Sequence, residues 1–332
     1  AANNNYWPEM YVNMAIADTT EPVEPYSDTP KPRRFGTVSP LDPQMFSTVE
    51  ELVADVLANR VDGRYHPVEV ARWLDDLADE AEDSLRAAKA KTDGRASFRR
   101  LELDVSVTIE LGRFFADKFR AATWYALHQS SGDAAALAVG VREYQQARAH
   151  WQRAVEITLP AYVADVSYGE GWFQRGHWSD RLAAIDRDLA AMSAAATQPV
   201  VAGQSEAGRQ LGKWADGSIR RPDVPMTHVA PRGYPIGRPV EIVLPGAPGV
   251  AEATLYFRRM TQAERWRSVA MEPASGGFRG EIPADAADGS FPLQYYFEVR
   301  VADGRAMIVP GLAALLANQP YCLLRPLPPP PT

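Results

Sequence analysis

The chain has 332 residues, a length typical of about two domains. Hydrophobic residues make up 46% and charged residues 23%, which is the composition of an ordinary globular protein. The net charge of −7 argues against a general binder of nucleic acid phosphates. Residues 47–193 hold 18 basic and 24 acidic side chains, whereas residues 194–332 hold 14 and 12. This uneven charge indicates two different modules.

The side chains that metals and covalent catalysis require are sparse. Cys322 is the single cysteine, which excludes an intramolecular disulfide and a cysteine-based zinc site. The five histidines lack the spacings of known zinc motifs, and no glycine-rich phosphate loop or nucleophile motif occurs. No apolar run reaches the ~18–20 residues of a membrane helix. We therefore expect no metal, no cofactor, no nucleic acid and no membrane partner.

The first 46 residues differ from the rest of the chain. They begin without an initiator methionine, a basic segment or an apolar leader, so we expect a piece of a larger precursor. Residues 8–17 have the composition of a strand. Seven prolines among residues 1–46 then exclude a long helix and predict an irregular wrap as far as residue 46.

Residues 47–193 have the pattern of an antiparallel helical bundle. Ser47 and Glu50 form a candidate capping box, and Pro67 suits the first position of the next helix. Apolar spacing and short breaks then predict long neighbouring helices in an up-and-down arrangement. The predicted helices cover about 48–59, 67–91, 96–130, 134–159 and 179–193, the last with Ser179 as its N-cap.

One charged stripe crosses the third of these helices. Glu110, Arg113 and Asp117 follow at i, i+3 and i+7 on an otherwise apolar helix. They form either a structural ladder of ion pairs or a face toward a neighbouring pocket, and we favour the ladder. We interpret the acidic run at residues 75–83 as a solvated helix face.

The C-terminal part alternates with the period of strands. Residues 194–237 are predicted as a linker held by Trp214, residues 238–326 as a β-sandwich and residues 327–332 as a proline-rich tail. About seven short strands with Pro-Gly, Gly-Gly and Asp-Gly turns predict an immunoglobulin-like or fibronectin-like sandwich. The fold class is therefore multidomain α plus β.

Two segments carry side chains suited to a sugar. The first combines Asn5, Tyr6, Trp7, Glu9 and Tyr11, where aromatic faces can stack on a pyranose and amides or a carboxylate can bind its hydroxyls. Glu9 is the one candidate for a catalytic carboxylate. The alternative is that these aromatics fill a core or a domain interface.

The second segment is the glycine-containing loop at residues 168–178. Its candidate contacts are Glu170, Trp172, Arg175 and His177. Such a loop can seal a pocket on another domain, or it can pack over the end of its own bundle, and we favour the second interpretation.

The predicted sandwich also contains aromatic residues that can form a carbohydrate platform. Alternation places Tyr295 and Phe297 on one face of the sheet and Tyr296 on the other, so at least one set belongs to the core. The full candidate set is Tyr256, Trp266, Phe278, Tyr295, Tyr296 and Phe297.

These features together resemble the region after the (β/α)₈ barrel in large multidomain bacterial glycoside hydrolases, typified by α-glucuronidases. The resemblance rests on the strand at 3–16, the strings Ser39-Pro-Leu-Asp-Pro43 and Gly63-Arg-Tyr-His-Pro67, and the long bundle. It implies an upstream catalytic domain or partner chain that holds the main acid/base carboxylates. It also implies a carbohydrate ligand, a periplasmic or secreted location, and Tyr6, Trp7 and Glu9 at the rim of the sugar pocket.

Our leading interpretation is the C-terminal accessory portion of a carbohydrate-active enzyme that alone lacks robust hydrolase activity. The alternative is a free-standing glycan-binding or scaffold protein without catalysis. A third is an autonomous enzyme that uses Glu170, Arg175 and His177 at the junction of bundle and sandwich.

Overall fold

The structure is a computed structural model, and it describes residues 15–17, 45–92, 95–167, 175–195, 205–261, 263–313 and 318–328. The chain divides into two compact units. A helical unit comprises the chain up to Asn59 together with Tyr65–Ile219, and a β unit comprises Arg60–Arg64 together with the chain from Arg220 onward. The predicted α plus β class is confirmed at this level. Most of the predicted 8–17 strand lies outside the described residues, and residues 15–17 are not a strand.

The first helix of the bundle, α2 (Val49–Leu57), begins one residue later than the sequence predicts. Its capping box is formed by Thr48 and Glu51, because Glu51 N–H donates to Thr48 Oγ1 at 3.2 Å and Thr48 N–H donates to Glu51 Oε2 at 2.8 Å. Ser47 instead donates its N–H to the carbonyl of Tyr65 at 2.9 Å. The predicted Ser47 cap is wrong because this backbone bridge takes Ser47 out of the helix.

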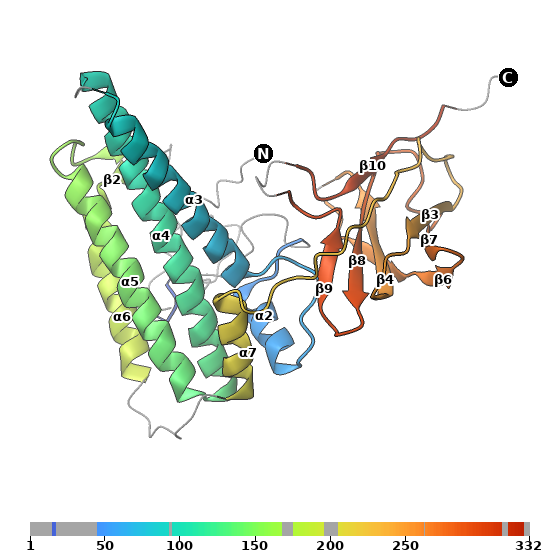
Figure 1. Ribbon diagram of the computed structural model, residues 1–332, viewed down its shortest axis with the longest axis horizontal. Helices are drawn as coiled ribbons and strands as arrows, with labels where there is room; N and C mark the ends of the chain where they lie inside the picture. The colour runs from blue at the N-terminus through green and yellow to red at the C-terminus, as the bar shows by residue number, and fades with distance from the viewer. Residues whose placement is uncertain are drawn as a thin grey trace. The chain divides into compact units, whose positions relative to one another are not determined.

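Four further helices complete the main bundle (Figure 1). The second helix, α3 (Pro67–Lys89), begins with Pro67 at its first position, as predicted. It packs along α4 (Ala96–Ser131), which packs along α5 (Ala134–Thr158), and α6 (Leu182–Ala195) lies against α5. Since short connections join α3 to α4 and α4 to α5, these helices run antiparallel to their neighbours. None of the described helices is both long and apolar enough to cross a membrane.

Two elements near the end of the bundle differ from the prediction. The last predicted helix begins with a 3₁₀ turn, η3 (Trp178–Arg181), whose N-cap is His177 rather than Ser179. The segment predicted as a linker contains a helix, α7 (Glu206–Ala215), with Ser205 as its cap. Trp214 on α7 is buried, which agrees with the expectation that it holds this segment in place. The helix has apolar residues at Ala207, Leu211 and Trp214, an i, i+4, i+7 spacing that the sequence analysis missed within a segment rich in Ala, Gly and Gln.

The β unit contains two antiparallel sheets. The larger sheet has the order β10 (Cys322–Leu324), β8 (Leu293–Val301), β4 (Val250–Arg259), β5 (Arg267–Ala270), and β9 (Ala306–Val309) also pairs with β8. The smaller sheet has the order β3 (Val240–Pro245), β7 (Gly277–Ile282), β6 (Glu272–Ala274). All the strands predicted from period-two alternation are present.

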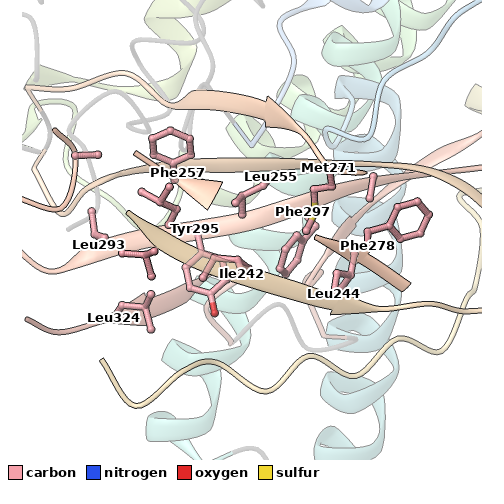
Figure 2. Packing of buried hydrophobic residues seen from close by; sticks show 14 of the residues in the cluster. Ile242, Leu244, Leu255, Phe257, Met271, Phe278, Leu293, Tyr295, Phe297 and Leu324 are labelled. Carbon is pink, nitrogen blue, oxygen red and sulfur yellow. The ribbon is translucent and has the colours of Figure 1, made fainter. Parts of the chain in front are cut away.

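One hydrophobic core lies between these sheets (Figure 2). Alternate residues of each strand supply it, since successive side chains of a strand point to opposite faces. Ile242 and Leu244 of β3 are fully buried, and so are Leu255 of β4 and Phe297 of β8. Two packed antiparallel sheets are therefore established, and the immunoglobulin-like or fibronectin-like topology stays a prediction.

Candidate functional site

Most of the sugar contacts predicted at the sequence level lie outside the described residues. These are Asn5, Tyr6, Trp7, Glu9 and Tyr11 of the N-terminal segment, and Glu170 and Trp172 of the loop. Arg175 lies in a two-residue strand, β2 (Arg175–Gly176), which pairs with β1 (Val166–Ser167). The structure therefore neither brings these residues together nor separates them.

His177 is the one loop candidate whose side chain is described, and it is buried. Its Nδ1 accepts a hydrogen bond from Ser179 N–H at 3.2 Å, while its own N–H donates to Asp180 Oδ2 at 2.8 Å. These bonds cap η3. Because Nδ1 accepts, the ring proton lies on Nε2, which is buried and has no hydrogen-bond partner among the described residues. The geometry assigns His177 a capping role.

The predicted aromatic platform of the β unit separates into two sets. Phe278, Tyr295 and Phe297 belong to the core between the sheets, so they cannot form a binding surface. Tyr256 and Tyr296 point to the opposite face of the larger sheet, where they are directly paired across β4 and β8. The alternation argument is thus confirmed, and it leaves one candidate face.

On that face the aromatic residues form a cluster around Tyr296. The rings of Tyr256 and Tyr296 stack with centroids 4.8 Å apart and an interplanar angle of 1°. The ring of Trp266 meets Tyr296 edge-on, also at 4.8 Å. Tyr296 itself is buried, so only Tyr256 and Trp266 remain partly exposed. Burial, followed by the charge of Glu298, raises the pKa of Tyr256 to about 12, so its hydroxyl stays protonated at neutral pH.

Arginine completes the cluster. The guanidinium of Arg258 lies 4.6 Å from the centroid of the Trp266 ring and donates to Gln294 Oε1 at 2.9 Å. The indole N–H of Trp266 is buried, and no group in the described part of the chain hydrogen-bonds to it. We call Tyr256, Tyr296, Trp266 and Arg258 the aromatic–arginine cluster. It combines apolar ring faces with hydrogen-bond donors, which are the groups that carbohydrate recognition uses.

A pocket of about 260 Å³ lies beside the cluster and shares Arg258 with it. It is formed by the end of β4, the following turn, the start of β5 and the segment after β7. Four guanidinium groups and two carboxylates line it, so the lining carries a formal charge of +2. The lining residues are Arg258, Arg259, Glu264, Arg265, Arg267, Asp285 and Ala286. The sequence signal for this site is the spacing of arginines at 258, 259, 265 and 267, which the sequence analysis missed.

The helical unit has a buried polar group that the sequence analysis also missed. Asp188 on α6 is almost fully buried and accepts the backbone N–H groups of Ile16 and Ala17, both at 2.7 Å. Lys118 on α4 is fully buried beside the rings of Phe114 and Tyr144. Burial lowers the pKa of Lys118 to about 7, although the charge of Asp188 opposes this shift.

The charged stripe on α4 forms ion pairs with neighbouring helices and also along α4 itself. Arg113 contacts Asp79 and Glu82 of α3, and Glu110 Oε2 lies 2.6 Å from His150 Nδ1 on α5. Asp117 lies 3.1 Å from Arg120, and burial raises its pKa to about 6. The favoured structural role is therefore correct, with partners on α3, on α5 and on α4 itself. In the parts of the chain that are described, no group of His, Cys, Asp and Glu residues is arranged to hold a metal.

Comparison with known proteins identifies no family. No family model matches the chain, and no curated protein matches it either. One similar solved structure is described as a GH138 enzyme targeting pectin rhamnogalacturonan II. The two chains are 12% identical, with a TM-score of 0.43 over 77% of this chain and 33% of that chain. This chain thus spans about a third of that protein's length, and a likeness at this level establishes neither its family nor its function.

Proposed function

We propose that this chain is the C-terminal accessory portion of a carbohydrate-active enzyme, a glycoside hydrolase in the broad sense, and that its β unit binds carbohydrate. The observation that carries the proposal is the aromatic–arginine cluster. Two partly exposed rings, Tyr256 and Trp266, lie with the Arg258 guanidinium on the sheet face that points away from the core, and Arg258 also lines a small pocket at the end of β4. Ring faces of this kind bind the apolar faces of sugars, and the adjacent donors bind hydroxyl groups.

The wider parts of the proposal rest on the residues of the sequence. An upstream catalytic domain, α-glucuronidase-like in the broad sense, would hold the principal acid/base carboxylates. Asn5, Tyr6, Trp7, Tyr11, Glu170, Trp172 and Arg175 are the proposed further sugar contacts, with Glu9 as one carboxylate of a catalytic pair. The immunoglobulin-like or fibronectin-like character of the β unit and a periplasmic or secreted location belong to the same proposal.

The test is a binding measurement on the full chain. A panel of immobilised glycans identifies a ligand, and calorimetry then compares the parent chain with Trp266→Phe and Tyr256→Ala. We expect each substitution to weaken binding about tenfold, because each removes ring area or a donor from the contact surface. Phe291→Ala, which removes an exposed aromatic ring elsewhere in the β unit, is the matched control and leaves affinity unchanged. Equal losses in all three variants, or no glycan bound at all, would refute carbohydrate binding by this face.

The second candidate function is a free-standing glycan-binding or scaffold protein. The same cluster supports it, since glycan binding needs no catalytic carboxylate. The mass of the native protein from its source separates the two. A mass far above 36.5 kDa favours the enzyme portion, whereas a mass near this value favours the free-standing protein.

A further inference from the structure

The pocket beside the aromatic–arginine cluster is cationic in a chain that is acidic as a whole. Its lining has a formal charge of +2, whereas the chain carries −7. This excess of +2 already counts the two lining carboxylates, each of which pairs with one of the four arginines. Glu264 pairs with Arg259 (Nε to Oε1, 2.6 Å), and Asp285 pairs with Arg267 (Nη1 to Oδ2, 2.7 Å). The hydrogen bond from Arg267 lowers the pKa of Asp285, so this carboxylate stays ionised and paired at neutral pH.

Neighbouring side chains hold the guanidinium groups in place. Arg267 lies 5.1 Å from the centroid of the Phe257 ring, and Phe257 is part of the core. Arg258 lies over Trp266 and donates to Gln294 Oε1. Arg259 also pairs with Asp288. Since these contacts restrict the side chains before any ligand arrives, a ligand meets cations that have little conformational entropy left to lose.

Arg265 and Arg267 are the exposed members of the set, and Arg265 lies in the turn. Arg265 precedes Trp266 directly, at the point where the turn after β4 returns to the sheet. A guanidinium at the mouth of a cationic pocket attracts an anion as it approaches and can hydrogen-bond it with two parallel donors. The positive charge is confined to a few arginines around one turn and does not extend along the surface as a stripe. Such a site suits a single acidic group rather than a nucleic acid backbone.

The size of the pocket restricts the ligand further. Pockets that hold drug-sized molecules measure about 300–1,000 Å³. A volume of about 260 Å³ falls just below that range and admits one small group, of the size of a single sugar ring. The adjoining ring faces of Tyr256 and Trp266 then offer a surface for a neighbouring sugar ring.

We propose that the pocket formed by Arg258, Arg259, Arg265 and Arg267 binds the acidic group of an acidic sugar, a carboxylate or a sulfate ester. This inference rests on the proposed function, because it names the class of carbohydrate that the β unit recognises. It makes the β unit a module that selects acidic glycans over neutral ones.

The experiment uses the full chain and calorimetry with four probes: galacturonic acid, N-acetylglucosamine 6-sulfate, glucose and inorganic sulfate. We expect one or both acidic sugars to bind more tightly than glucose and than inorganic sulfate. We also expect this binding to weaken as sodium chloride is raised from 50 to 500 mM, since salt screens the charges. Arg265→Gln should weaken it about tenfold. This variant removes an exposed side chain, so its fold is expected to persist, and circular dichroism checks this.

The control is Arg279→Gln, which removes an equally charged, exposed residue of β7 on the other sheet. It should leave binding of the acidic sugar unchanged. Equal affinity for glucose and the acidic sugars, with no effect of Arg265→Gln, overturns this inference while carbohydrate binding stands. Binding of inorganic sulfate as tight as that of the acidic sugars overturns the selection of sugars. No binding of any sugar overturns both this inference and carbohydrate binding.

Discussion

At the scale of single residues, the most constrained group in the helical unit is the pair of Asp188 and Lys118. Asp188 accepts two backbone N–H groups from residues 16 and 17, so its carboxylate fixes a point of the N-terminal segment on α6. A buried ammonium beside two aromatic rings is costly when charged, which is why burial dominates the pKa of Lys118. The resulting linkage makes the stability of the helical unit depend on pH.

Replacing Lys118 by methionine should remove that dependence. Between pH 7 and the ordinary lysine pKa of 10.5, the unfolded chain holds a proton that the folded chain lacks. The free energy of unfolding of the parent therefore rises with pH across this window. We expect Lys118→Met to be the more stable protein at pH 6, by an amount that shrinks as the pH is raised to 9. Urea unfolding followed by circular dichroism at 222 nm measures both.

The control for this change is Lys89→Met, which removes an exposed lysine of α3. Its stability relative to the parent should not vary with pH in the same window. A stability difference between Lys118→Met and the parent that stays constant from pH 6 to pH 9 would show that Lys118 keeps its proton when folded.

The sequence could not reveal Lys118 or Asp188 as partners. Lys118 follows Asp117 directly and Arg120 lies two residues on, so its local sequence resembles that of a solvated charge. Its environment comes from α5 and α6, which are distant in sequence. The surroundings of Trp266 and Arg258 likewise come in part from a distant element, because Trp266 contacts Tyr296 of β8 and Arg258 donates to Gln294 of the same strand. Alternation predicts that Tyr296 faces away from Tyr295, but only the fold shows that Tyr296 is buried there.

At the scale of elements, one carboxylate holds the beginnings of two helices. Asp133 Oδ1 caps α5 by accepting from Ala135 N–H at 2.9 Å and Ala136 N–H at 3.0 Å. Its Oδ2 accepts from Ser205 N–H at 3.0 Å, and Ser205 Oγ accepts from Gly208 N–H to cap α7. The sequence predicts the α5 cap from Gly132-Asp133. It cannot predict α7 in the same way, because the Asp133 contact joins residues 72 positions apart.

Substitutions at Asp133 should separate these two roles. Asp133→Ala removes the cap and leaves Ser205 N–H without its acceptor, so we expect a loss of about 2–3 kcal/mol from the free energy of unfolding. Asp133→Asn keeps an oxygen for the α5 cap but puts an NH₂ group opposite Ser205, and should cost about 1 kcal/mol. Chemical denaturation of the helical unit checks the order. Equal losses for the alanine and asparagine variants would contradict the double role.

At the scale of the whole molecule, the chain contributes to the β unit twice. Residues 60–64, between α2 and α3, belong to the β unit together with the chain from Arg220. Gly63 N–H donates to Glu298 Oε2 at 3.1 Å, and Arg300 Nη1 donates to the carbonyl of Val61 at 3.1 Å. A Cβ on Gly63 would lie 2.7 Å from Glu298 Cγ, so only glycine fits without movement there. The Asp62-Gly63 break was predicted from sequence, but its contacts on β8 depend on the folded sheets.

Arg221 should be the residue on which this arrangement depends most. Its guanidinium donates to the carbonyls of Asp62 at 3.2 Å and Ala306 at 3.1 Å, and also to the carbonyl of Arg64. Arg221→Met keeps most of the aliphatic stem but leaves these three partly buried carbonyls without their donor, which should cost the β unit about 2 kcal/mol. Hydrogen exchange should then show faster exchange at the Gly63 amide, whose bond to Glu298 depends on the position of this segment.

A matched arginine distinguishes this effect from a simple loss of charge. Arg279 pairs with Glu241 at 3.5 Å on the smaller sheet, and both side chains are exposed, so Arg279→Met should change stability by less than ~1 kcal/mol. If Arg221→Met leaves exchange at Gly63 at the parent rate, residues 60–64 hold their place through Glu298 and Arg300 alone. Glu298→Gln should then release residues 60–64. A neutral amide oxygen accepts hydrogen bonds from Gly63 N–H and Arg300 more weakly than the carboxylate does.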